Sequence, residues 1–433
     1  MIFYRQYGHY LRLYYRIHNR LIIAAIFLVL GATLFTINAL SGIPNVWRLL
    51  MAFASLCSIL VSGYFIYTDW RRIRDERFNI QIIDDDNFHQ KASSLEVKHG
   101  TIFDRINDYF ISFDPSINPV IDSLKSPIEI RRPPYQVPFP LRSFMAKAVN
   151  KRRPTSDDPK IGLRSDLDLD ILSGRIEVQE TTYFAGISTN EITPSRVVLI
   201  NREQNRHEKI CTLFEDFVSD NGKLVPLSRS ILSNHIGVTT LLITRDPCIA
   251  LQWQGDTQVD KMKINVGASG SADWRDLARS PAHFDLDGKP VKTLQNVVRY
   301  AMEREANEEL SAKIGEQFSR TKITGYARYV HRGGKPEFFG ITFLNQEYSD
   351  LRIRRHEKKW VLTKESRKVR DHSKPAVIDA IASLQEEFDP RRTTAASISM
   401  LLCLRFAGEY LRRDDVRFED IVPPGFSKDV SIA

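Results

Sequence analysis

Two long stretches without a charged residue lie near the start of this 433-residue chain. The first is LIIAAIFLVLGATLFTINAL at 21–40, and the second is LLMAFASLCSILVSGYFIY at 49–67. An α-helix rises about 1.5 Å per residue, so about twenty residues span roughly 30 Å, the thickness of the hydrocarbon part of a bilayer. The pattern predicts two transmembrane helices joined by the short loop at 41–48.

Charged residues on either side of these stretches predict their orientation. The loop contains one arginine, Arg48, whereas the flanks are rich in arginine: Arg5, Arg12, Arg16, Arg20, Arg71, Arg72 and Arg74. The positive-inside rule then places both termini in the cytoplasm. A cleaved signal peptide is the competing interpretation, but the first stretch is long for one and no A-x-A site follows it. We therefore expect residues 1–70 to form a two-span membrane hairpin.

The composition of the whole chain is that of a globular protein. Hydrophobic residues make up 42% and charged residues 26%. The net charge of +8 weakly favours phosphate-bearing partners or anionic lipid. The four cysteines are isolated and form no CxxC pair, which argues for free thiols and against a zinc site. Proline-rich basic stretches at 131–143 and 150–160 indicate that residues 71–230 form a connector and an accessory α+β region.

Residues 231–433 show more regular patterns. Strands are predicted at 236–246 and 248–255 around an Asp-Pro turn, and a strand entering a Gly/Ser turn at 262–276. Apolar residues with a period near 3.6 predict an amphipathic helix at 294–314. A hairpin at 322–346 would turn at Gly333 and Gly334, and two helices would follow at 374–388 and 394–413. The pattern predicts a cytoplasmic α/β (α+β) domain with a mixed sheet between helices.

Three glutamates cluster on the helix predicted at 294–314. Glu305, Glu308 and Glu309 stand at i, i+3 and i+4, so they share one face and repel one another by roughly 0.2–0.5 kcal/mol per close pair. Mg²⁺ would offset this repulsion, because it binds carboxylate and phosphate oxygens together and can activate a phosphoryl group. The alternative is a solvated helix in which Arg299 pairs with Glu303 and Arg304 with Glu308.

The run REANEE at 304–309 resembles the core of the Nudix box, G-x5-E-x7-R-E-U-x-E-E-x-G-U, where U is a bulky apolar residue. The resemblance implies a Nudix-like domain whose metal ligands are Glu305, Glu308 and Glu309, with Mg²⁺ as the cofactor. The chain departs from the box at four positions. Its first glycine falls on Pro290, its first glutamate on Asn296, its inner apolar residue on Ala306 and its second glycine on Ser311.

Two membrane spans, a connector and a C-terminal degenerate Nudix domain resemble the transmembrane Nudix effectors of CBASS, the bacterial anti-phage systems that signal with cyclic oligonucleotides. The resemblance implies that the domain, called SMODS-associated Nudix, senses a cyclic di- or oligonucleotide made by a partner CD-NTase. A homo-oligomer would then disrupt the inner membrane and cause abortive infection, with the lipid bilayer as a second partner and no long nucleic acid. The alternatives are a membrane-tethered, Mg²⁺-dependent Nudix hydrolase of a nucleoside diphosphate derivative, and a membrane scaffold without a small ligand.

Candidate nucleotide-binding residues follow two turns. A nucleotide needs a flat group for its base and donors for its phosphates. The segment VGASGSADWRD offers backbone amides near Gly270 and Ser271 as an anion nest, followed by Trp274 and Arg275. Arg328 and Tyr329, beside the predicted Gly-Gly turn, are second candidates. The competing interpretations are a plain Gly/Ser turn and a solvated basic hairpin.

Overall fold

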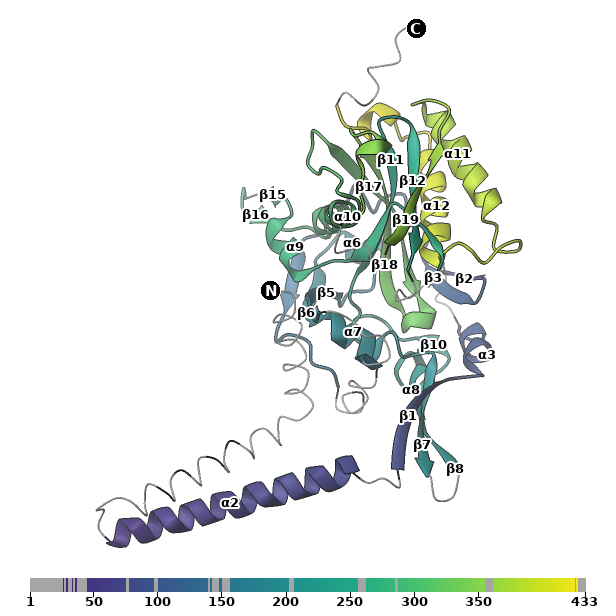
Figure 1. The fold of residues 1–433 in the computed structure, drawn as a ribbon. Helices are drawn as coiled ribbons and strands as arrows, with labels where there is room; N and C mark the ends of the chain where they lie inside the picture. The colour runs from purple at the N-terminus through teal and green to yellow at the C-terminus, as the bar shows by residue number, and fades with distance from the viewer. Residues whose placement is uncertain are drawn as a thin grey trace.

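The computed structural model describes most of the chain beyond the first predicted span (Figure 1). The described residues are 26, 29, 33, 36, 45–74, 78–96, 100–138, 141, 148–149, 156–201, 206–255, 262–284, 287–354, 361–424 and 426.

A nine-stranded mixed sheet forms the centre of the structure (Figure 1). Its main path runs β13-β12-β11-β18-β17-β3-β2, while β14 pairs with β11 and β19 pairs with β12. β11 and β18 are parallel, from Gly237 opposite Glu337 to Thr244 opposite Leu344, and the other pairs are antiparallel. The strands are β2 (Ile102–Ile106), β3 (Tyr109–Phe113), β11 (Gly237–Thr244), β12 (Cys248–Gln254), β13 (Ile264–Val266), β14 (Ala268–Ser271), β17 (Ser319–Tyr329), β18 (Lys335–Leu344) and β19 (Val361–Lys368).

Several predicted elements are confirmed. β11 and β12 form the expected antiparallel pair, and β17 and β18 form the expected hairpin. The turn of that hairpin contains Gly333 and Gly334 with φ of 64° and 72°, values that favour glycine. The stretch predicted as a Gly/Ser turn is instead strand β14, which pairs with β11 from Gly237–Ser271 to Thr240–Ala268.

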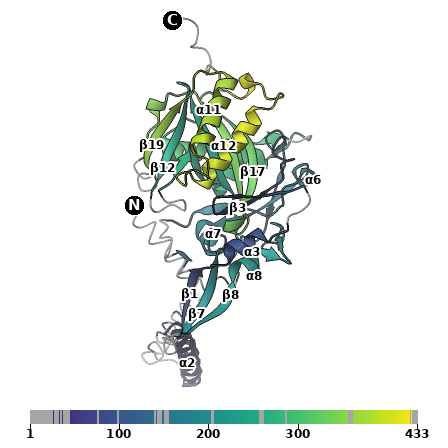
Figure 2. The ribbon, with the colours of Figure 1, turned by 90° about the vertical axis from the view of Figure 1, so that its right-hand side faces the viewer.

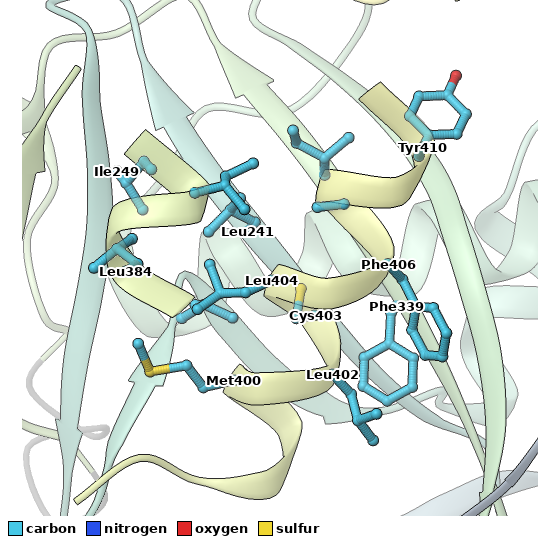
Figure 3. Packing of buried hydrophobic residues seen from close by; sticks show 14 of the residues in the cluster. Leu241, Ile249, Phe339, Leu384, Met400, Leu402, Cys403, Leu404, Phe406 and Tyr410 are labelled. Atoms are coloured by element: carbon cyan, nitrogen blue, oxygen red, sulfur yellow. The ribbon is translucent and has the colours of Figure 1, made fainter. Parts of the chain in front are cut away.

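Helices cover both faces of the sheet. α10 (Leu294–Leu310) lies on one face, and α12 (Ile398–Leu411) lies on the other beside α11 (Lys374–Glu387) (Figure 1). The α12 face holds a continuous apolar core with Leu241, Ile249 and Leu404 (Figure 3). There the ring of Phe406 packs against Phe339, with ring centroids 5.3 Å apart.

α10 buries the apolar stripe that predicted it. Leu294, Val297, Val298, Ala301 and Met302 are fully buried against the sheet, at the spacing of one helix face. The Thr293 hydroxyl caps the first turn by accepting from the Asn296 amide. The helix is shorter than the predicted 294–314 because the chain turns at position 311 into the left-handed region, with φ of 57°.

A second, three-stranded sheet from the accessory region packs against the α10 face. Its order is β4-β6-β5, with β4 (Ile128–Arg131), β5 (Pro159–Leu163) and β6 (Ile176–Thr182). The Ile161 amide donates to the Ala272 carbonyl at 3.0 Å, and the Ile236 amide donates to the Ile161 carbonyl at 2.8 Å. Because β2 and β3 also join the central sheet, residues 71–230 and 231–433 share one core.

The remaining elements are short, apart from α2 (Asn45–Arg74). A third sheet, β1 (Phe78–Asp84), β7 (Ser195–Asn201) and β8 (Arg206–Thr212), extends from the main body toward α2 (Figures 1 and 2). The others are α3 (Phe88–Ser93), α6 (Leu169–Leu172), α7 (Tyr183–Thr189), α8 (Leu213–Phe217), α9 (Trp274–Arg279), β9 (Ser219–Asp220), β10 (Lys223–Leu224), β15 (His283–Phe284), β16 (Pro290–Val291) and the 3-10 turns Val330–Arg332, Tyr348–Asp350 and Phe418–Asp420.

The predicted membrane hairpin is corrected by the structure. The first predicted span lies outside the described residues except at four single positions, and the second lies within α2. Within the described part of the chain, none of the helices has both the length and the apolar character that crossing a membrane requires. The two-span fold and the multi-pass location in the inner membrane are therefore wrong for these residues.

A buried glutamate on α10 gives the fold a pH dependence. Glu303 accepts a hydrogen bond from the Thr321 hydroxyl at 2.9 Å, and burial raises its pKa to about 7 from an ordinary 4.5. The folded state therefore binds the proton more tightly, so this contribution to stability is complete below pH 4.5 and is lost as the pH rises through 7. Glu303→Gln should flatten that profile and stabilise the protein at pH 8 by about 2–3 kcal/mol.

The measurement is the free energy of unfolding from denaturant titrations at several pH values between 5 and 8. Glu386→Gln is the matched control, because the Glu386 side chain is 78% exposed on α11. Parallel profiles for the wild-type chain and Glu303→Gln would contradict the assignment.

Candidate functional site

Two of the three glutamates of the Nudix-like motif, Glu305 and Glu309, bind strand β14. The Ser271 amide donates to Glu305 Oε1 at 3.2 Å, and the Ser269 amide donates to Glu309 Oε2 at 3.2 Å. Glu309 also accepts from the Gln252 side chain at 3.1 Å. The strand amides expected to form an anion nest therefore bind carboxylates of α10.

Gly270 allows this close approach of helix and strand. A Cβ atom at position 270 would lie 2.2 Å from the Glu305 carboxylate, so a side chain there would displace that carboxylate. Burial raises the pKa of Glu305 to about 7, although Arg304 and Lys160 oppose that shift. Glu305 is thus partly protonated near neutral pH.

Arg304 is the centre of the site. Its Nε donates to Asp276 Oδ1 at 3.0 Å, and its Nη2 donates to the Ser271 carbonyl at 2.8 Å. Its Nη1 donates to Glu305 Oε1 at 3.0 Å and to Glu308 Oε2 at 2.8 Å. Burial opposes the charge of this guanidinium, but Glu305 and Asp276 outweigh burial and raise the pKa of Arg304.

Two aspartates at the start of α9 complete the buried part of the site. Asp276 is fully buried and also accepts from the Asp273 amide at 2.8 Å, and burial raises its pKa even beside Arg304. Asp273 forms an ion pair with Lys160 of β5. Burial would raise the pKa of Asp273, but Lys160 and Arg304 outweigh it and lower that pKa.

The exposed part of the site consists of Trp274, Arg275 and Glu308. Arg275 Nη2 donates to Glu308 Oε1 at 2.7 Å and lies 2.9 Å from Asp273 Oδ2. The Arg275 side chain is 47% exposed, whereas Trp274 is half-buried against the apolar core of the α10 face. A ligand would therefore meet Arg275, Glu308 and the exposed part of Trp274 first.

The carboxylates of this site, as arranged, do not fit a divalent cation. Glu305 and Glu308 share the Nη1 group of Arg304, and Glu309 is bound by an amide and by Gln252. Among the described residues, no three acidic, histidine or cysteine side chains are grouped to hold a metal ion. The predicted ligands of Mg²⁺ thus carry protein donors where a cation would bind.

The position of the missing glutamate has a structural role. The Asn296 amide group donates to the Pro281 carbonyl at 3.1 Å and its Oδ1 accepts from Arg299 at 3.2 Å. Arg299 also donates to Asp122 at 2.9 Å rather than pairing with Glu303. Of the two ion pairs expected for a solvated helix, only that between Arg304 and Glu308 forms, at 2.8 Å.

Arg328 and Tyr329 do not join this site. Arg328 is bound to the Gly334 carbonyl at 3.0 Å and the Val225 carbonyl at 2.8 Å. Tyr329 is fully buried on the α12 face, with its hydroxyl 3.1 Å from Ser399 Oγ. These two side chains hold the hairpin and the core together.

Sequence reasoning missed Lys160, Asp273 and Asp276. The two aspartates flank Trp274 and Arg275 with the i, i+3 spacing of a helix start, a local signal that could have identified them. Lys160 lies 113 residues before Asp273, and only the docking of β5 brings the two together.

Comparisons with known proteins report similarity only to solved structures. No family model matches the chain, and no curated protein matches it. DR0079 from Deinococcus radiodurans is 12% identical over 44% of this chain and 95% of its own, with a TM-score of 0.25. The MutT protein from Methanosarcina mazei Go1 is 10% identical over 40% of this chain and 94% of its own, with a TM-score of 0.22.

A third structure, Tm1382, is described as a Nudix hydrolase. It is 10% identical over 41% of this chain and 69% of its own, with a TM-score of 0.24. In the chain itself, a mixed sheet carries the glutamate helix α10 on one face and α12 on the other.

Removing the central guanidinium should destabilise the protein strongly. Arg304→Met leaves the fully buried carboxylate of Asp276 without its cation, and breaking a buried pair in this way costs about 3–5 kcal/mol. Adding Asp276→Asn removes the uncompensated charge and should recover part of the loss. Denaturant titrations of the two single variants and the double variant measure the coupling.

Arg279→Met is the control for this cycle, because Arg279 is exposed at the end of α9. Equal stability of Arg304→Met and the control would show that the network does not hold the fold.

Proposed function

We propose that the Nudix-like domain recognises a cyclic di- or oligonucleotide at Trp274, Arg275 and Glu308 without hydrolysing it. The observation that carries this proposal is the position of Arg304. Its Nη1 group lies 3.0 Å from Glu305 Oε1 and 2.8 Å from Glu308 Oε2, so the glutamates that would bind a catalytic metal bind an arginine. This arrangement supports recognition over cleavage.

The exposed groups suit a nucleotide. The ring of Trp274 offers a flat apolar surface for a base, and the exposed guanidinium of Arg275 offers a donor for a phosphate. Both residues stand at the start of α9, whose first turn is fixed by Asp276 and Arg304. The binding surface is therefore preorganised by a buried network.

The charge of the site favours a small ligand over a long polyanion. Five carboxylates, from Asp273, Asp276, Glu305, Glu308 and Glu309, surround three cations, from Lys160, Arg275 and Arg304. Long nucleic acids bind through many phosphate contacts with basic groups, which this acidic excess opposes. A compact ligand can place one phosphate at Arg275 and its base at Trp274.

The biological setting that we propose is a CBASS anti-phage system. A partner CD-NTase would supply the cyclic nucleotide, and the chain would respond as a homo-oligomeric sensor. The support is the resemblance carried by REANEE together with the recognition surface at α9 and α10.

Titration calorimetry of the full chain against a panel of cyclic dinucleotides tests the proposal. We expect saturable binding that survives chelation of divalent cations, and Arg275→Ala should weaken it at least tenfold because the phosphate donor is lost. Arg279→Ala, which removes an exposed arginine of the same helix, should bind normally.

Hydrolysis is followed in the same samples. Mg²⁺-dependent turnover of a nucleoside diphosphate derivative that disappears in Glu308→Gln would favour the hydrolase and would overturn the proposal. The absence of binding to every cyclic nucleotide would leave a scaffold as the better description.

The affinity should depend on pH through Glu305. Its pKa of about 7 means that its carboxylate gains a negative charge between pH 6 and pH 8, beside the groups that meet the ligand's phosphate. We expect the dissociation constant to rise several-fold over this range and to change less in Glu305→Gln. A calorimetric pH series that is identical for both proteins would contradict this role of Glu305.

A further inference from the structure

Arg164 is a buried cation bound by neutral acceptors. It follows β5, and only 2% of its surface is exposed. Its Nε donates to Gln179 Oε1 at 2.8 Å, and its Nη1 donates to the Leu232 carbonyl at 2.7 Å and the Ser230 carbonyl at 3.2 Å. Its Nη2 has no hydrogen-bond partner within the described part of the chain.

Other buried or partly buried cations of the described chain are paired with carboxylates. Arg304 contacts Asp276, Arg332 contacts Glu191 and Lys335 contacts Glu337, while Lys160 contacts Asp273. Arg164 forms no such pair with any carboxylate among the described residues. An unpaired charge in a protein interior raises the free energy of the folded state. A bound anion at Arg164 would therefore stabilise this position.

An aromatic ring lies against this guanidinium, and two further arginines end the neighbouring strand β4. Arg164 lies over the ring of Tyr135, 4.9 Å from its centre. Tyr135 is fixed in place, because its hydroxyl donates to the Ile231 carbonyl at 2.8 Å and its amide donates to the Glu180 carbonyl at 2.7 Å. Arg131 and Arg132 are exposed at the end of β4, and the register of β4 and β6 sets Arg131 opposite Gln179, the partner of Arg164.

The local charge is positive. Arg131 already pairs with Glu177 at 3.3 Å, and Arg132 adds a further positive charge next to it in the chain. Burial lowers the pKa of Arg164 to about 10, so it remains a cation at neutral pH. The planar N–H fork of arginine matches the oxygens of a phosphate group, which carries the missing negative charge.

We propose that Arg164, with Arg131, Arg132 and Tyr135, forms a binding site for a phosphate group. The source is either free phosphate or the phosphoryl group of a nucleotide, since both present the same oxygens. This site is built on the β4-β6-β5 sheet and does not use the carboxylates of α10, so it is independent of the function proposed above.

The test uses the full chain with inorganic phosphate, pyrophosphate and a cyclic dinucleotide, in calorimetry at constant ionic strength. We expect saturable binding of at least one of them. Arg131→Ala/Arg132→Ala, which changes only exposed side chains, should weaken it at least tenfold, and Arg164→Lys should do the same because lysine keeps the charge and loses the fork. The control is Arg175→Ala, since Arg175 is 77% exposed in the same sheet.

Arg275→Ala separates this site from the surface of α9. Binding that persists in Arg275→Ala and is lost in Arg164→Lys supports the phosphate site, whether the ligand is phosphate, pyrophosphate or the nucleotide. Tight binding of pyrophosphate identifies free phosphates as the source, and binding of the cyclic dinucleotide alone identifies a nucleotide. Failure of the wild-type chain to bind any of the three, or equal binding by the double variant, would overturn the proposal.

Discussion

The ion-pair network of Arg304 is the interaction on which the candidate site depends. A buried arginine is stable only when acceptors surround its donors, and here they come from α9, α10 and β14. The same bonds that compensate the charge therefore fix three elements to one another. α10 keeps its glutamates close together because Arg304 and the amides of β14 offset their repulsion.

Other buried ion pairs join the accessory region to the domain. Asp122 accepts from Arg299 of α10 at 2.9 Å and from the Ile323 amide of β17 at 2.9 Å. Lys160 of β5 binds Asp273, at the start of α9. These pairs lie where residues 71–230 meet residues 231–433, so the site at α9 and α10 is incomplete without the region that precedes it.

The sequence predicted the local elements of the domain well and its long-range contacts poorly. The helix of α10 and the hairpin of β17 and β18 were identifiable because their apolar period and their Gly-Gly turn are local. β14 was taken for a turn because ASGS has a turn-like composition, and only its pairing with β11 makes it a strand. The hydrogen bond that Glu305 accepts from the Ser271 amide was not predictable from the sequence either. The pairing of β14 with β11 places Ser271 beside Glu305.

The limits of local patterns also explain the membrane prediction and the missed cations. The membrane prediction rested on two uncharged stretches, whereas none of the described helices is long and apolar enough to cross a membrane. Lys160 ends the proline-rich stretch 150–160 that indicated a connector, whereas the structure places Pro159–Leu163 in strand β5 and Arg164 directly after it. A strand has a period of two, so both residues and Gly162 share one face, while Ile161 and Leu163 face the apolar core.

Gly162 is required on that face because a Cβ atom there would lie 2.6 Å from the Ser233 carbonyl. β5 thus packs closely against its neighbours and has a cation near each end. Lys160 forms an ion pair with Asp273, whereas Arg164 forms no ion pair with a carboxylate among the described residues. A phosphate at Arg164 would complete the charge balance of this strand. The strand also contacts the start of α9, so the two proposed sites lie at opposite ends of one rigid element.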